Sequence, residues 1–222
     1  MALNNNALTL LVTAKDHMDI TDASQDTRVE RLINVASEFI ARYCRRTLVT
    51  TAHTEYVDGR GGNRITLKEW PILSGPALGA THPEVFIDNS SLFAASTVID
   101  PLSYYVANQV SLIRVGGDNS SSGTTWNKGY RNIKVNYTAG LGIVNTGAVT
   151  NTFPADLEQA CLDYVMWLFD MRNDRRVGRV NKSKAGESVT YINDIPPHIT
   201  ILLDPYVKFE LPIEAPVGIG NR

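Results

Sequence analysis

One amphipathic segment near the N-terminus most constrains the fold of this chain. Within residues 27–46, apolar side chains recur three and four positions apart, which places them on one face of an α-helix. Arg42, Arg45 and Arg46 crowd the C-terminal turn of this segment, where the helix dipole favours cations. The sequence therefore predicts a helix over residues 27–46. Its apolar face consists of Val29, Leu32, Ile33, Ala36, Phe39, Ile40, Tyr43 and Cys44.

A second long helix is predicted to begin at Pro154, whose missing N–H costs nothing in a first turn, and to reach Met171. One apolar stripe runs along it from Leu157. Further apolar surface lies outside that stripe, and a helix that is apolar on more than one side needs more than one neighbour. Two interpretations stay open, a helix central to its own core and a contact between subunits. The candidate subunit interface consists of Met166, Trp167 and Phe169.

Between these helices the pattern is typical of short β-strands. Residues 51–57 are rich in threonine and β-branched side chains, and residues 64–67 alternate with a period of two. Glycines in residues 58–63 can supply the positive φ angles of a reversal, so a hairpin is predicted. Further strands are predicted at residues 84–88, 103–107, 109–115 and 131–137.

The ends of the chain carry weaker signals. A short helix is predicted over residues 13–18, with Thr13 as its N-cap. Another short helix is predicted over residues 195–206, ended near Pro205. The last residues hold Pro212 and Pro216, which is typical of an extended arm.

Together these elements predict an α+β fold. Residues 1–206 form one domain, in which a small helical bundle core carries a β-rich insertion of a hairpin and short antiparallel strands. The helical core takes residues of about 13–50 and 154–206, the insertion takes about 51–137, and an extended C-terminal arm takes residues 207–222.

Composition excludes some classes of function. Apolar residues make up 43% and charged residues 20%, as in a folded globular protein. Twenty-one lysines and arginines against 23 aspartates and glutamates give a net charge of −2, which argues against a protein that grips phosphate backbones. The N-terminus lacks the pattern of a signal peptide, and no run of residues is apolar enough for a membrane span.

The strongest charge feature is basic and follows the second long helix. Such a cluster can complement a helix dipole, or it can contact DNA or an acidic partner surface. The mild net acidity favours the helix end or a protein contact over sustained DNA binding. This candidate basic contact patch consists of Arg172, Arg175, Arg176, Arg179, Lys182 and Lys184.

Motifs of catalysis and of metal or cofactor binding are not found. The four histidines lie on different predicted elements, so a metal site would need a chance convergence. The glycines of Gly140-Leu141-Gly142 precede the helix at Pro154 by too many residues to cradle a phosphate. We therefore expect no enzyme, no cofactor and no metal. Cys44 and Cys161 lie on apolar helix faces, which predicts buried free thiols, although a disulfide stays possible.

An ordered series of short motifs resembles the head–tail connector, adaptor and head-completion proteins of tailed bacteriophages. No single motif is specific, but their order covers most of residues 10–206. The motifs are Thr13-Ala14-Lys15 with Asp19-Ile20, Tyr43-Cys44-Arg45-Arg46, Asp58-Gly59, Ile65-x-Leu67 with Pro71-Ile72, Tyr137-x-Ala139-Gly140, Pro154-Ala155-Asp156-Leu157 with Ala160, and Leu202-Leu203-Asp204-Pro205-Tyr206.

This resemblance implies a structural virion protein at the head–tail junction, assembled in the cytoplasm of the bacterial host. It implies a closed ring, commonly of twelve subunits, beneath the portal protein, which extends the DNA channel and offers a platform to tail or stopper proteins. DNA would pass the lumen without specific binding. The C-terminal arm is a candidate for docking on the portal through Phe209, Leu211 and Ile213.

Two other functions stay open. A tail-completion or stopper protein would differ from a connector only in its position in the assembly. A carbohydrate- or ligand-binding β module of a virion would expose aromatic side chains along a sugar site. The candidate aromatic residues for that site are Trp70, Tyr104, Tyr105 and Trp126.

Overall fold

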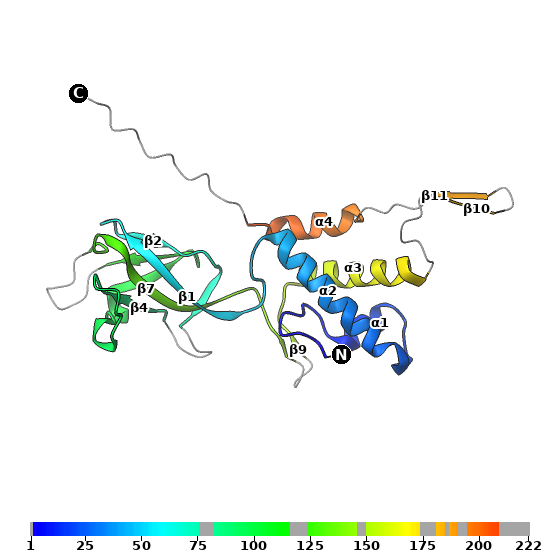
Figure 1. The fold of residues 1–222 in the computed structure, drawn as a ribbon, viewed down its shortest axis with the longest axis horizontal. Helices are drawn as coiled ribbons and strands as arrows, with labels where there is room; N and C mark the ends of the chain where they lie inside the picture. Colours follow the sequence, from blue (N-terminus) through cyan, green and yellow to red (C-terminus); the bar gives the residue numbers. More distant parts are fainter. Residues whose placement is uncertain are drawn as a thin grey trace, which may run out of the picture.

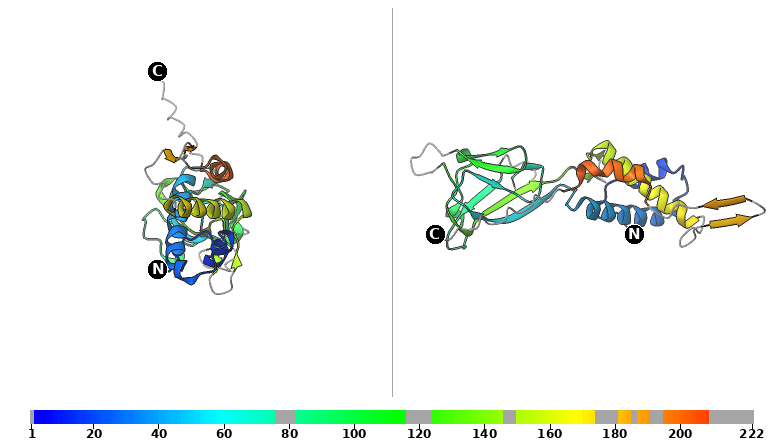
Figure 2. Two further views of the ribbon diagram at one scale, coloured as in Figure 1. Left: turned by 90° about the vertical axis from the view of Figure 1, so that its right-hand side faces the viewer. Right: turned by 90° about the horizontal axis from the view of Figure 1, so that it is seen from above.

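The computed structural model describes residues 2–75, 82–115, 124–145, 150–173, 181–184, 187–190 and 195–208. A helical part and a β part lie next to each other along the long axis of the molecule (Figure 1). The view from above shows that narrow connections join the two parts (Figure 2). The fold is α+β with antiparallel sheets, which confirms the predicted fold class.

The helical part is organised by two long helices that pack against each other. Ile33, Ile40, Leu157 and Val165 are all fully buried between them. Burying one such side chain contributes about 1.5–3 kcal/mol, so this contact is a main source of stability. Both predicted long helices are confirmed. The α-helices are α1 (Leu11–His17), α2 (Asp26–Cys44), α3 (Ala155–Asn173) and α4 (Pro197–Leu203), with 3-10 helices at Ala23–Gln25 and Asp204–Tyr206.

The ends of α1 and α2 have different causes. α2 ends because Arg45 adopts a left-handed conformation with a φ of 54°, and its N–H donates to the carbonyls of Ala41 and Arg42. α1 begins with Leu10 as its N-cap and has no side-chain cap, so the predicted cap at Thr13 is wrong. Leu8 is buried in the helical core and Leu10 is also buried, and the chain therefore enters α1 earlier than the capping pattern indicates. No helix in the described ranges is long and apolar enough to cross a membrane.

The β part contains two antiparallel sheets. In the first sheet the central strand is β7 (Gly129–Ala139), which pairs with β1 (Thr51–Gly59), β3 (Ile72–Ser74) and β4 (Glu84–Ile87). In the second sheet the order is β2 (Arg64–Thr66), β6 (Ser111–Arg114), β5 (Tyr104–Ala107). Short 3-10 helices lie at Ala95–Thr97 and Pro101–Ser103, and two small hairpins are formed by β8 (Val144–Asn145) with β9 (Thr150–Asn151) and by β10 (Asn181–Lys184) with β11 (Glu187–Thr190).

The predicted hairpin of residues 51–57 with residues 64–67 is wrong in its pairing. Both strands exist and the chain reverses between them, but β1 pairs with β7 and β2 pairs with β6. The reversal is long enough to carry the chain from one sheet to the other. Ile65 then packs beside Leu112, so burial of β2 in the second sheet decides its partner. The strands predicted at residues 84–88, 103–107, 109–115 and 131–137 are all present.

The two parts have separate cores. The β core contains Val85, Leu112, Ile133 and Trp126, each almost fully buried. The helical core contains no residue of this cluster. The predicted limit between the domain and its C-terminal arm stays a prediction, because residues 209–222 lie outside the described residues.

Arg46 links the two parts at their junction. It follows α2, is 6% exposed, and its guanidinium lies 3.7 Å from the centroid of the Trp70 ring. Its Nη2 also donates to the carbonyl of Trp70. Burial lowers the pKa of Arg46, and the nearby Glu69 carboxylate opposes that shift. A stacked, buried guanidinium of this kind fixes the direction in which the chain leaves α2.

The outgoing and returning chains run beside each other at the same junction. The N–H of Leu141 donates to the carbonyl of Leu48 (2.8 Å), and the N–H of Thr50 donates to the carbonyl of Gly142 (2.8 Å). Gly140 makes this approach possible. Its φ is 144°, and a Cβ atom there would lie 2.4 Å from the Cα of Thr50. The glycine pattern of residues 140–142 thus serves a close backbone crossing.

Substituting Gly140→Ala should therefore destabilise the protein by about 2 kcal/mol or more, because the new methyl group meets backbone that cannot turn aside. The urea dependence of unfolding measures this loss. Gly62→Ala is the matched control, since a Cβ there meets nothing within 4 Å. Equal stabilities of the two variants would contradict the close crossing.

Candidate interaction surfaces

The three residues of the candidate subunit interface face different surroundings on α3. Met166 is 41% exposed. Trp167 and Phe169 are half-buried and pack against the helical core of their own subunit. Met166 is thus the most exposed of the three apolar side chains. A role of all three in contacts between subunits stays a prediction.

Aromatic stacking explains why Trp167 is half-buried. The ring of Tyr164 stacks on Trp167 with centroids 5.5 Å apart, and it also stacks on Phe39 of α2 with centroids 4.7 Å apart. Phe169 is covered differently, by the guanidinium of Arg28 at 4.2 Å from its centroid. These contacts hold α2 on α3, which is the interpretation of a helix central to its own core.

The basic contact patch is described only in part. Arg172 is exposed in the last turn of α3. Lys182 and Lys184 belong to β10, which pairs with β11. Arg175, Arg176 and Arg179 lie outside the described residues. In Figures 1 and 2 the β10–β11 hairpin lies beyond the C-terminal end of α3, away from the β part.

The last described residues before the C-terminal arm lie at the junction of the two parts. Lys208, the last described residue, donates its N–H to the carbonyl of Cys44 (2.9 Å), and its Nζ lies 3.4 Å from Oε1 of Glu69. The portal-docking candidates Phe209, Leu211 and Ile213 lie outside the described residues. The chain therefore begins its arm beside Glu69, at one end of the β part.

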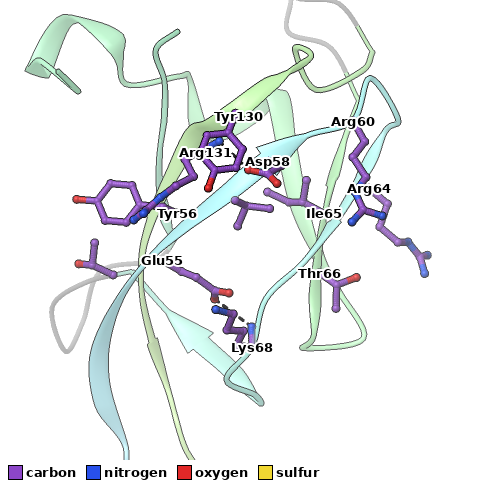
Figure 3. A pocket seen from close by; sticks show the side chains of 12 residues that line it. Glu55, Tyr56, Asp58, Arg60, Arg64, Ile65, Thr66, Lys68, Tyr130 and Arg131 are labelled. Carbon is purple, nitrogen blue, oxygen red and sulfur yellow. Dashed lines mark hydrogen bonds between the residues drawn. The ribbon is translucent and has the colours of Figure 1, made fainter. Parts of the chain in front are cut away.

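A groove of about 750 Å³ lies next to that point and was not anticipated from the sequence. Its sides are formed by β1 and β2, and residues of β7 lie at its rim (Figure 3). Arg60, Arg64 and Lys68 are exposed along it, and no hydrogen bond or ion pair joins their side chains to another described residue. The four-residue spacing of these cations was the sequence signal that could have indicated the groove. The strands that pair with β1 and β2 are remote in sequence, so the spacing alone could not show that a groove forms there.

The carboxylates of the groove are already occupied. Glu55 Oε2 accepts hydrogen bonds from the hydroxyl of Tyr137 (2.9 Å) and from the N–H of Lys68 (3.0 Å). Asp58 Oδ1 accepts from the N–H of Arg131 (2.7 Å). Burial, with the Glu55 charge, raises the pKa of Tyr137 well above its usual range. Both acids therefore act in the fold, and the groove keeps an excess of positive charge.

Asp88 likewise holds its own loop together. Its carboxylate accepts hydrogen bonds from the side chain and N–H of Ser90 and from the N–H groups of Leu92 and Phe93. The hydrogen bond from the Ser90 hydroxyl is the largest of the effects that lower the pKa of Asp88. This geometry identifies Asp88 as the residue that fixes the turn after β4.

His17, His198 and Asp163 lie on three different helices and meet in the structure, a contact that no sequence pattern predicts. Nε2 of His17 lies 3.2 Å from Asp163 Oδ1, and Nε2 of His198 lies 3.7 Å from Asp163 Oδ2. The side-chain amide of Gln159 donates to the same carboxylate (2.7 Å). In the described part of the chain, no group of three or more histidines, cysteines and carboxylates is arranged to hold a metal ion. The contact ties α1 and α4 to α3.

The aromatic residues of the sugar-binding alternative do not form an exposed platform. Trp126 is 1% exposed and Tyr104 is 3% exposed, so both belong to the β core. Trp70 is half-buried beneath Arg46, and only Tyr105 has a largely exposed ring. The arrangement disfavours that alternative, because stacking of a sugar needs an open aromatic face.

Two family models match parts of the chain. A family model described as head completion protein matches residues 102–209. A second model, described as phage gp6-like head-tail connector protein, matches residues 9–66. None of the curated proteins matches the chain.

Two solved structures share the fold over almost the whole chain. One, described as the neck of an empty GTA particle computed with C6 symmetry, has a TM-score of 0.56 and 14% identity, and covers 95% of this chain and 94% of its own. The other, the neck of a native GTA particle computed with C12 symmetry, has a TM-score of 0.54 and the same identity and coverage. At this identity the likeness shows the fold.

The chain is thus a structural protein of the virion. It belongs to the head–tail connector and head-completion proteins of phages, as its motifs predict, and it is a protein that joins head to tail.

The two cysteines are free and buried, as predicted, and their chemistry supplies a test of the helical core. Burial raises the pKa of Cys161 to about 12 and that of Cys44 to about 11. At pH 8 both groups are thiols, and only the thiolate attacks a disulfide reagent. Neither cysteine should react with dithionitrobenzoate in the native protein, and both should react in guanidinium. Rapid reaction of either one under native conditions would contradict the packing of α2 on α3.

Proposed function

We propose that this protein forms a closed ring of twelve subunits beneath the portal and extends the DNA channel toward the tail. The observation that carries the proposal is the pair of family matches at both ends of a chain whose whole fold resembles a neck subunit. Those neck structures were computed with six-fold and twelve-fold symmetry. A heterologous contact, in which one face of each subunit binds a different face of the next, gives such a ring when it closes.

The charge of the protein fits a channel that DNA passes without being held. The net charge is −2, so the subunit as a whole does not attract phosphate strongly. The basic contact patch at the end of α3 is then a docking surface for an acidic protein partner. Portal and tail or stopper proteins are the partners of this proposal, and the virion junction, reached after assembly in the host cytoplasm, is its location.

The contact between neighbouring subunits runs along α3 in this proposal, and Met166 gives the sharpest test. Met166→Glu should leave folding intact, because the side chain is already exposed, and should prevent ring formation by placing charges in an apolar contact. Sedimentation velocity with purified portal measures the assembled species.

Val35→Glu is the matched control for this test, since Val35 is 47% exposed on α2. Substitution of Trp167 is a poorer test, because its ring stacks on Tyr164 and its loss would also weaken the subunit. A Met166→Glu protein that assembles as the control does would remove α3 from the ring contact.

The C-terminal arm is the portal contact in this proposal. Deleting residues 209–222 should abolish attachment to portal-bearing heads. The unfolding midpoint should stay unchanged, because all the buried residues of both cores are kept. Co-sedimentation of the variant with heads measures attachment. Attachment at the level of the full chain would sink the docking role of the arm.

A further inference from the structure

The groove between β1 and β2 is bordered by strand edges that carry unused hydrogen-bonding groups. Among the strands that the structure describes, β1 pairs only with β7 in the first sheet and β2 pairs only with β6 in the second. Such an edge presents the N–H and C=O groups of every second residue, and another strand can add to it. The groove is therefore a candidate site for an added strand.

The hydrogen bonds between β2 and β6 show which backbone groups of β2 face the groove. The N–H of Leu67 donates to the carbonyl of Val110, and the carbonyl of Asn63 accepts from the N–H of Arg114. Both pairs continue the register in which β2 pairs with β6. Residues 63, 65 and 67 therefore direct their peptide groups to β6. Those of Arg64, Thr66 and Lys68 point the other way, and the Lys68 N–H already bonds Glu55 across the groove.

The side chains of β2 define what an added strand must look like. Arg64 and Lys68 lie on the exposed face, whereas Ile65 and Leu67 are 5% and 3% exposed on the core face. Directly opposed residues of an antiparallel pair share a face. A matching strand thus needs two acidic residues four positions apart, with apolar residues between them at the second and fourth places.

The chain itself contains this pattern just after its last described residue. Residues 210–214 read Glu-Leu-Pro-Ile-Glu. Run antiparallel to β2, they place Glu210 opposite Lys68, Leu211 opposite Leu67, Pro212 opposite Thr66, Ile213 opposite Ile65 and Glu214 opposite Arg64. Both charge pairs are attractive and both apolar pairs lie on the core face.

The position of Lys208 favours the same arrangement. Its Nζ lies 3.4 Å from Oε1 of Glu69, the residue next to Lys68, so a strand that starts here and follows β2 would be antiparallel to it. Five residues of β2 and its extension span about 16 Å, which six residues of arm cover in an extended conformation. From these observations we propose that residues 209–214 add to the free edge of β2 in the free subunit.

Pro212 sets the strength of this pairing. It lacks the N–H that would bond the Thr66 carbonyl, so one ladder bond at the centre of the added strand is not made. The strand is consequently held weakly enough to be withdrawn. Its withdrawal would free the arm for the portal; that consequence rests on the proposed function, whereas the pairing itself does not.

Amide hydrogen exchange of the full-length free subunit, followed by NMR, tests the pairing without portal or ring. The amides of Arg64, Thr66, Glu210 and Glu214 should be protected, and those of Leu211 and Ile213 should exchange freely. Glu210→Lys with Glu214→Lys should reduce the protection about tenfold, since two attractive cross-strand pairs become repulsive. Arg64→Glu with Lys68→Glu should do the same, and the combination of all four substitutions should restore it.

Two controls separate strand pairing from charge attraction. Pro212→Val supplies the missing N–H and should raise the protection about fivefold. Reversal of two exposed arginines on α2, Arg31→Glu with Arg42→Glu, changes the net charge by the same amount as Arg64→Glu with Lys68→Glu. It should leave the exchange of these amides unaffected.

Three results would overturn the proposal. The first is equal exchange in the full chain and in the Glu210→Lys, Glu214→Lys variant. The second is a lack of restoration when all four charges are exchanged. The third is protection of Arg64 and Thr66 that arises only when a 20-base-pair DNA duplex is added, which would assign the cations to nucleic acid.

Discussion

The packing of α2 on α3 is the constraint on which the rest of the structure depends. The two helices are separated by the whole β part in the sequence, yet their buried faces form one core. The chain must therefore leave α2 and return to α3 at nearly the same place. Arg46 fixes the exit by stacking on Trp70, and Gly140 permits the return beside Thr50. The β part is consequently an insertion between α2 and α3 with its own core.

This division separates the surfaces by role. The helical part carries Met166 and the basic end of α3, which suit contacts between subunits and with other junction proteins. The β part carries the cationic groove, and the arm starts where the two parts meet. In the proposed function, such a subunit keeps its core unchanged while its edges engage neighbours, because the residues proposed to dock are not those that hold the fold.

Local patterns in the sequence predicted the elements better than their partners. The apolar faces of α2 and α3 and the strand β7 follow from periodicity, since a helix or strand face is a local property. The pairing of β1 with β7 joins residues about 80 positions apart, and no local signal specifies it. The predicted hairpin failed for this reason, and Thr13 failed as a cap because burial of Leu8 and Leu10 overrode the capping pattern.

The candidate surfaces were predicted less completely than the fold. The sequence indicated Met166, Trp167 and Phe169 together, but only the three-dimensional stacking of Trp167 on Tyr164 distinguishes a free side chain from core. The groove depends on two strand edges that become neighbours after folding. The most direct test of the central claim is the mass of the protein in solution, alone and mixed with purified portal, by size exclusion with light scattering. A ring, or a monomer that joins the portal in fixed stoichiometry, is predicted; a monomer indifferent to the portal would contradict the account.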